Sequence, residues 1–129
     1  MTRLYSSISV ETTLASTISS SATTMTVATG TGSALLGGVT LAAGNVDQFT
    51  VALDPDTTNE EIVFITASSS DTFTITRARA GSSAVQHSAG ATVKHVLTSD
   101  DLNAFKAAIS PVASMGFAGS TSGSTTVQA

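Results

Sequence analysis

The residues best suited to chemistry gather in one stretch, residues 75–96, which reads ITRARAGSSAVQHSAGATVKHV. It contains three of the five basic side chains and both histidines of the chain: Arg77, Arg79, Lys94, His87 and His95. Arginine is a fixed donor of several hydrogen bonds, and histidine can donate, accept, bind a metal or move a proton. The stretch is therefore either a binding or catalytic site or a set of structural hydrogen-bonding groups.

The two histidines do not form a recognisable metal or cofactor site, because further ligands are missing. His87 and His95 lie eight positions apart, and no third ligand stands at a spacing that would complete a metal site. The chain has no cysteine for a thiolate zinc site. We expect no metal and no cofactor, and keep a small carbohydrate-binding or metal-binding β-module using His87, His95 and Arg79 as one alternative.

The sequence contains no motif that is typical of an enzyme. Glu60 and Glu61 are adjacent, and adjacent strand residues face opposite ways, so they cannot form an acid–base pair. Asp54 and Asp56 resemble a calcium loop, but the intervening Pro55 and a missing glycine favour a turn. No serine stands in a GxSxG motif, and the segment GTGSALLGG has no lysine for phosphate. We expect the protein not to be an enzyme.

Composition excludes further classes. The net charge is −4 and only 11% of residues are charged, which argues against nucleic-acid binding. No segment approaches the roughly 18 apolar residues of a membrane span. Aromatic residues make up 5% of the chain, too few for a thick core, so we expect thin β-layers that are stabilised by association with other chains.

The elements that must position these residues are mostly strands. Alternating apolar residues and turn signals predict strands at 13–18, 24–28, 48–53, 61–66, 72–77 and 91–97, with a loop over 29–44 that contains an extended piece at 39–41. The predicted fold is mainly β, a small antiparallel sheet, sandwich or barrel-like module, with one short C-terminal helix and extended ends.

A change of period after residue 97 predicts that helix. Thr98 suits an N-cap, Asp101 follows three positions later, and Pro111 is expected to end the helix. Leu102, Phe105 and Ile109 recur at helical spacing. Because so short a helix is marginal alone, this stripe needs a partner, either the chain's own sheet or other copies of the chain.

These segments define the expected organisation. Residues 1–12 form an N-terminal arm, 13–97 a β-rich domain, 98–110 the helix and 111–129 a Gly/Ser/Thr-rich linker. The last residues read like the opening of another strand, so we expect either that the natural chain continues or that this tail pairs with another subunit.

The assembled pattern resembles a module of known type. Glu61, the strand 62–66 and the motif T-x-x-R-x-x-x-G-[ST]-x-A-x-x-H-x-x-G-x-x-V, followed by a helix from about Ser99, resemble the N-terminal attachment module of tail fibres of tailed bacteriophages. The motif residues in this chain are Thr74, Arg77, Gly81, Ser82, Ala84, His87, Gly90 and Val93.

This resemblance implies a trimeric virion protein, made in the host bacterial cytoplasm, that attaches a fibre to the phage tail. Leu102, Phe105 and Ile109 would line the trimer axis. The arm around Arg3, Leu4 and Tyr5 would dock on an adaptor, nozzle or baseplate protein. The host receptor would be met only by a distal region, with no role for nucleic acid or membrane. A capsid decoration protein of the phage head is the second alternative.

Within such a module the opening stretch has a structural role. We expect Arg77 and His87 to act as braces that donate hydrogen bonds to loop carbonyls or to a carboxylate such as Glu61.

Overall fold

The computed structural model describes residues 3–41 and 47–113, with side chains as far as residue 107. The chain divides into two compact units, residues 1–98 and residues 99–129. The elements are β1 (Arg3–Leu4), β2 (Thr12–Thr13), β3 (Thr24–Thr26), α1 (Gly32–Leu36), β4 (Gln48–Leu53), β5 (Glu61–Ser69), β6 (Thr72–Arg79), β7 (Thr92–His95) and α2 (Ser99–Ala113).

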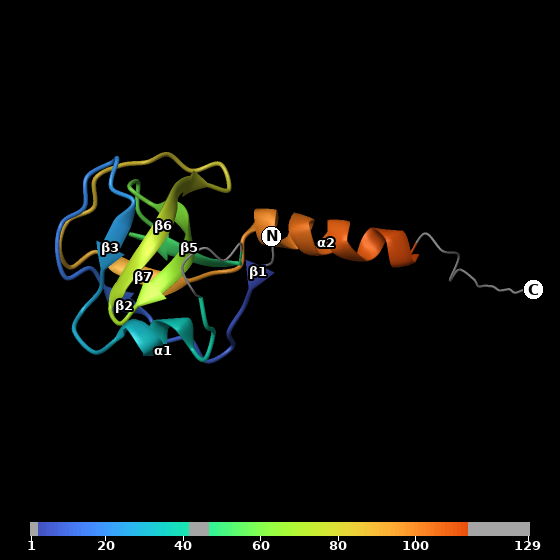
Figure 1. Cartoon of the computed structure of the whole chain (residues 1–129). Helices are drawn as coiled ribbons and strands as arrows, with labels where there is room; N and C mark the ends of the chain where they lie inside the picture. The colour runs from blue at the N-terminus through green and yellow to red at the C-terminus, as the bar shows by residue number, and fades with distance from the viewer. Residues whose placement is uncertain (1–2, 42–46, 114–129) are drawn as a thin grey trace, which may run out of the picture. The chain divides into compact units, whose positions relative to one another are not determined.

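The strands of the first unit form one sheet that curls on itself (Figure 1). Its order is β2-β7-β4-β5-β6-β3, with antiparallel neighbours, while β1 pairs with β4 in parallel. The end strands β2 and β3 approach each other where Leu14 bridges Val27, and Ala15 N–H donates to the Thr26 carbonyl at 2.9 Å. The mainly β fold with a short C-terminal helix is therefore confirmed.

Alternation along the strands fills the interior of this curled sheet. Phe49, Val51 and Leu53 of β4 are fully buried. The matching residues of the other long strands are equally enclosed: Val63, Ile65, Phe73, Ile75 and Val93. Each such side chain contributes about 1.5–3 kcal/mol by leaving water, so the core is thin but sufficient to hold the loops at its ends.

The hairpin of β5 and β6 is longer than its sequence pattern predicts. Residues 67–69 were expected in the loop, yet they pair with residues 72–74 across a two-residue turn at Ser70 and Asp71. Their sequence, Ala-Ser-Ser, hid them, because serine is typical of turns and these residues carry no large apolar side chain. β6 likewise continues to Arg79.

A short helix, α1, replaces part of the loop expected over residues 29–44. It ends at Gly37, which has a left-handed φ of 54° and donates its N–H to the Ser33 carbonyl. Leu35 and Leu36 are buried by it. Five residues are too few to produce a helical period in the sequence.

The side chain of Asp71 fastens the chain just before this helix. Its two carboxylate oxygens accept hydrogen bonds from the N–H groups of Gly30 and Gly32, each at 2.9 Å. These bonds lower the pKa of Asp71. The β5–β6 turn therefore holds the start of α1 in place.

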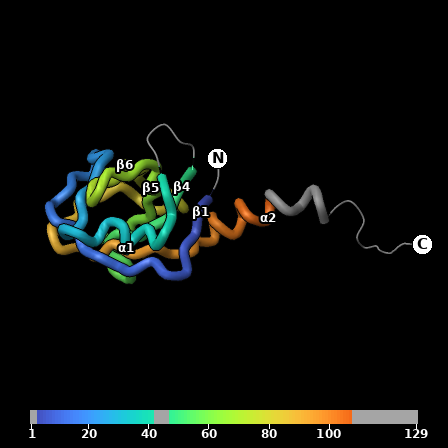
Figure 2. Tube along the Cα trace, turned by 60° about the horizontal axis from the view of Figure 1, so that its bottom comes forward, coloured from blue at the N-terminus to red at the C-terminus, as the bar shows by residue number. Residues whose placement is uncertain are grey.

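The N-terminal residues lie against the β-domain (Figure 2). After β1, residues 5–11, here called the strap, run beside α1: Ser6 Oγ donates to the Gly37 carbonyl at 2.8 Å, and Val10 N–H to the Ala34 carbonyl at 2.9 Å. Ser9 Oγ also donates to the Leu35 carbonyl. The expected arm is thus bonded to its own domain from residue 3 onward.

The second unit contains α2, which continues two residues past Pro111 instead of ending there. A proline removes one backbone donor, so it weakens a helix without necessarily stopping it. Asp100 and Asp101 occupy the first turn, where the helix dipole favours negative charge. Neither helix in the described residues is long and apolar enough to cross a membrane.

Candidate functional site

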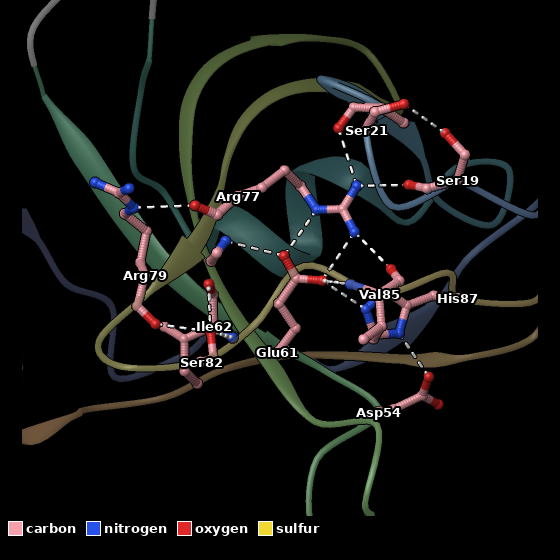
Figure 3. A network of polar contacts seen from close by, with 12 residues as sticks. Ser19, Ser21, Asp54, Glu61, Ile62, Arg77, Arg79, Ser82, Val85 and His87 are labelled. Carbon is pink, nitrogen blue, oxygen red and sulfur yellow. Dashed lines mark hydrogen bonds and ion pairs between the residues drawn. The ribbon is translucent and has the colours of Figure 1, made fainter.

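The Glu61 carboxylate is the centre of a polar cluster in the curled sheet (Figure 3). Glu61 opens β5 and has no exposed surface. Arg77 of β6 grips it with two parallel bonds, Nε to Oε2 and Nη2 to Oε1, both 2.8 Å long. This bidentate geometry is the strongest form of arginine–carboxylate pairing.

Arg77 also binds the carbonyl groups of two loops. Its Nη1 donates to the Ser19 carbonyl at 2.7 Å and to the Ala22 carbonyl at 3.0 Å, and its Nη2 to the Val85 carbonyl at 2.6 Å. One guanidinium thereby connects β5 to two segments far away in the sequence.

His87 completes the cluster. The ring is buried, with Nδ1 2.7 Å from Asp54 Oδ2 and Nε2 2.9 Å from Glu61 Oε1. Which nitrogen donates depends on the tautomer of the ring. The cluster places Arg77 and His87 within hydrogen-bonding distance of the Glu61 carboxylate, and these contacts offset much of the cost of burying it.

Glu61 remains ionised despite its burial. Burial alone would raise its pKa, but hydrogen bonds from Arg77, from His87 and from the backbone N–H groups of Ala78 and Val85 outweigh this effect. The pKa of Glu61 falls from 4.5 to about 2. A carboxylate so strongly bound is a poor proton acceptor, and every one of these contacts is with a group of the protein itself.

The sequence-predicted braces are therefore brought together, together with a residue that sequence reasoning missed. The sequence predicts a turn role for Asp54, but this residue is the second partner of His87. The only sequence signal for Asp54 is its position directly after β4. Because Leu53, the last residue of β4, pairs with Glu61, Asp54 lies beside the cluster. That signal becomes readable only when the strand register is known.

Other residues of the motif shape the loops around the cluster. Ser82 Oγ accepts from Ile62 N–H at 2.9 Å and ties the 80–91 loop to β5. Gly81 and Gly90 have φ values of 83° and 90°, a region that side chains disfavour. Val93 returns the chain to the core with no exposed surface.

The residues of the carbohydrate or metal alternative do not form one site. His95 stacks on Phe49, donates through Nδ1 to the Thr50 carbonyl at 2.7 Å, and accepts at Nε2 from Ser6 N–H at 3.3 Å. Arg79 instead donates to the Arg77 carbonyl at 3.0 Å. Within the described residues, no group of three or more candidate ligands could hold a metal ion.

The two adjacent carboxylates are not equivalent. Glu60 is exposed, whereas Glu61 is buried.

The predicted docking residues serve their own domain in part. Arg3 donates to Gln48 Oε1 at 2.8 Å and lies 4.3 Å from the centre of the Phe64 ring, and Leu4 packs on the core. Tyr5 is 45% exposed. A role for these three in virion docking stays a prediction.

The predicted axis residues lie on α2. Leu102 and Phe105 are 55% and 58% exposed, which is unusual for side chains of this size. Ile109 lies in the same helix, and its side chain is outside the described residues.

Comparison with known proteins adds no relative. No protein-family model matches the chain, and no curated protein matches it.

Proposed function

We propose that this chain is a structural virion module that attaches a tail fibre of a tailed bacteriophage to the tail and associates as a trimer through α2. The observation that carries the proposal is the uncovered pair Leu102 and Phe105 on a short helix. With Ile109 they follow the 3–4 spacing of a coiled-coil seam.

The energetics of the helix support association. A 15-residue helix is close to the lower limit of stability in water. In a trimer, Leu102 and Phe105 of each copy would leave water, and this burial would stabilise the helix. Mutual packing of α2 helices is the simplest way for identical copies to cover the same stripe.

The β-domain supports a passive role. Among its best-organised polar groups, Glu61 and His87 are buried and Arg77 is nearly so, and the three bind one another and loop carbonyls. Such a cluster holds loops in fixed positions, as an attachment domain under mechanical load requires. The motif that resembles the phage fibre module includes Arg77 and His87 and lies close to Glu61 in the fold.

Docking on the tail is assigned to the exposed part of the N-terminal segment. Arg3 and Leu4 also serve their own domain, so the proposed contact extends from them into the strap, where Ile8 and Val10 are 71% and 58% exposed. An adaptor, nozzle or baseplate protein with an apolar groove would suit these side chains.

The decisive experiment locates the protein on particles and removes this contact. Labelled chain imaged on virions should lie at the tail. The double change Ile8→Asp and Val10→Asp should produce particles without fibres, whereas Ser7→Asp, which puts a charge on an exposed neighbouring position, should not. Label on the head surface would favour the decoration alternative, and fibres retained by the double variant would refute the docking assignment.

A further inference from the structure

Two exposed apolar residues of the β-domain lie where the chain leaves it towards α2. Tyr5 is 45% and Leu97 62% exposed. β1 pairs with the start of β4, and β7 also pairs with β4. Just after β7, Val96 N–H donates to the Thr50 carbonyl of β4 at 3.3 Å. The bond from Ser6 N–H to His95 Nε2 joins the two segments directly. Tyr5 and Leu97 therefore belong to one end of the domain.

Covalent geometry keeps this end close to the helical seam. Leu97 is separated from Ser99, the first residue of α2, by one residue, and Leu102 lies three residues into the helix. Fully extended chain and helical rise together place the Cα atoms of Leu97 and Leu102 at most about 12 Å apart. This limit holds for any orientation of the two units. Association through Leu102 thus brings several copies of Leu97 near one axis.

The chemistry of the surface suits contact with its own copies. The residues directly around Leu97 read HVLTS and have no carboxylate, ammonium or guanidinium group, and the nearest charged residues in the sequence are Lys94 before them and Asp100 after them. Around a symmetry axis identical groups meet, so charged residues would repel one another and neutral apolar ones would not. Removing exposed Tyr and Leu side chains from water in an interface is also energetically favourable.

We propose that Tyr5 and Leu97 form a contact between copies of this chain, so that the β-domains of the trimer pack against one another beside the helical seam. This inference rests on the proposed trimer and adds to it a second interface. It also assigns Tyr5 to subunit contact rather than to the tail. Three domains joined in this way present their straps at fixed spacing.

The sequence provides two clean probes of the contact. Tyr5 is the only tyrosine and the chain has no tryptophan, so its fluorescence reports this surface alone. The chain has no cysteine, so Leu97→Cys introduces a single thiol for cross-linking. Val10→Cys is the matched control, because Val10 is an equally exposed aliphatic residue bonded to α1.

The experiment compares the full chain with its Leu102→Asp variant, which keeps the β-domain but disrupts the seam. Acrylamide should quench Tyr5 less in the trimer than in the monomeric variant. A short bis-maleimide should link Leu97→Cys chains to one another and leave Val10→Cys chains unlinked. If the full chain is trimeric, absence of either result would overturn this inference while the trimer stands. A monomeric full chain would overturn both.

Discussion

Glu61 has no exposed surface, yet its carboxylate stays ionised because five N–H donors surround it. Two of them belong to Arg77, whose side chain is itself 9% exposed. Removing one member of such a group leaves a buried charge without a partner, which is costlier than the pair is favourable.

Glu61→Gln should therefore lower the free energy of unfolding by about 3–5 kcal/mol, the usual cost of breaking a buried ion pair. Urea denaturation followed by circular dichroism measures it. Glu60→Gln, one position away and exposed, should change stability by less than about 0.5 kcal/mol. Equal effects of the two substitutions would show that the cluster is not a brace.

The same carboxylate predicts an acid sensitivity. Its pKa is about 2 in the folded protein and 4.5 without these contacts. A lowered folded pKa stabilises the protein above pH 4.5, and this contribution, about 3 kcal/mol, disappears as the pH falls from 4.5 towards 2. Urea titrations across that interval should show the loss in the natural chain and a smaller one in Glu61→Gln. A natural chain no more acid-sensitive than the variant would contradict the assignment.

How far sequence reasoning reaches at this scale is clear from two residues. The hydrogen-bonding types of the side chains predict Arg77 and His87 as braces, with Glu61 or loop carbonyls as acceptors. Asp54 could not be distinguished from Asp56, because its role follows from the pairing of Leu53 with Glu61 and from the position of His87 between Asp54 and Glu61. Both are tertiary facts.

Elements differ in how well their sequences specify them. β4 has the bounds its alternation predicts, Gln48–Leu53, because both its faces are buried and turn residues follow it. β2 has only two residues, since Leu14 and Ile18 beyond it make isolated bridges instead of a continuous ladder. α1 was missed because its stability comes from Leu35 and Leu36 in the core and from Asp71, not from its own periodicity.

The start of α1 supplies a prediction for this scale. A Cβ at Gly32 would lie 2.4 Å from the Ser70 carbonyl oxygen and 3.0 Å from Asp71 Cα, both backbone atoms. Gly32→Ala should therefore displace the turn that holds α1 and cost about 1–3 kcal/mol, as overpacking does. Ser33→Ala, exposed in the same helix, is the control. Thermal unfolding compares them, and a Gly32→Ala chain as stable as its control would mean that the turn and α1 can separate freely.

At the scale of the whole molecule, the parts have different tasks. The β-domain is held by a thin apolar core and one buried ionic cluster, and the residues of both come from a single chain. Leu102 and Phe105 on α2, by contrast, are large apolar side chains that remain half-exposed. Association is therefore expected to depend on α2 first, and on the Tyr5 and Leu97 surface second.

The mass of the chain in solution tests this central claim most directly. Light scattering on the full chain at micromolar concentration should give three times the 12.9 kDa of one chain. Leu102→Asp with Phe105→Asp should reduce it to a single chain with an unchanged β-domain spectrum, while Asn103→Asp, exposed on the same helix but off the stripe, should remain trimeric. A natural chain that is monodisperse at 12.9 kDa would contradict the account.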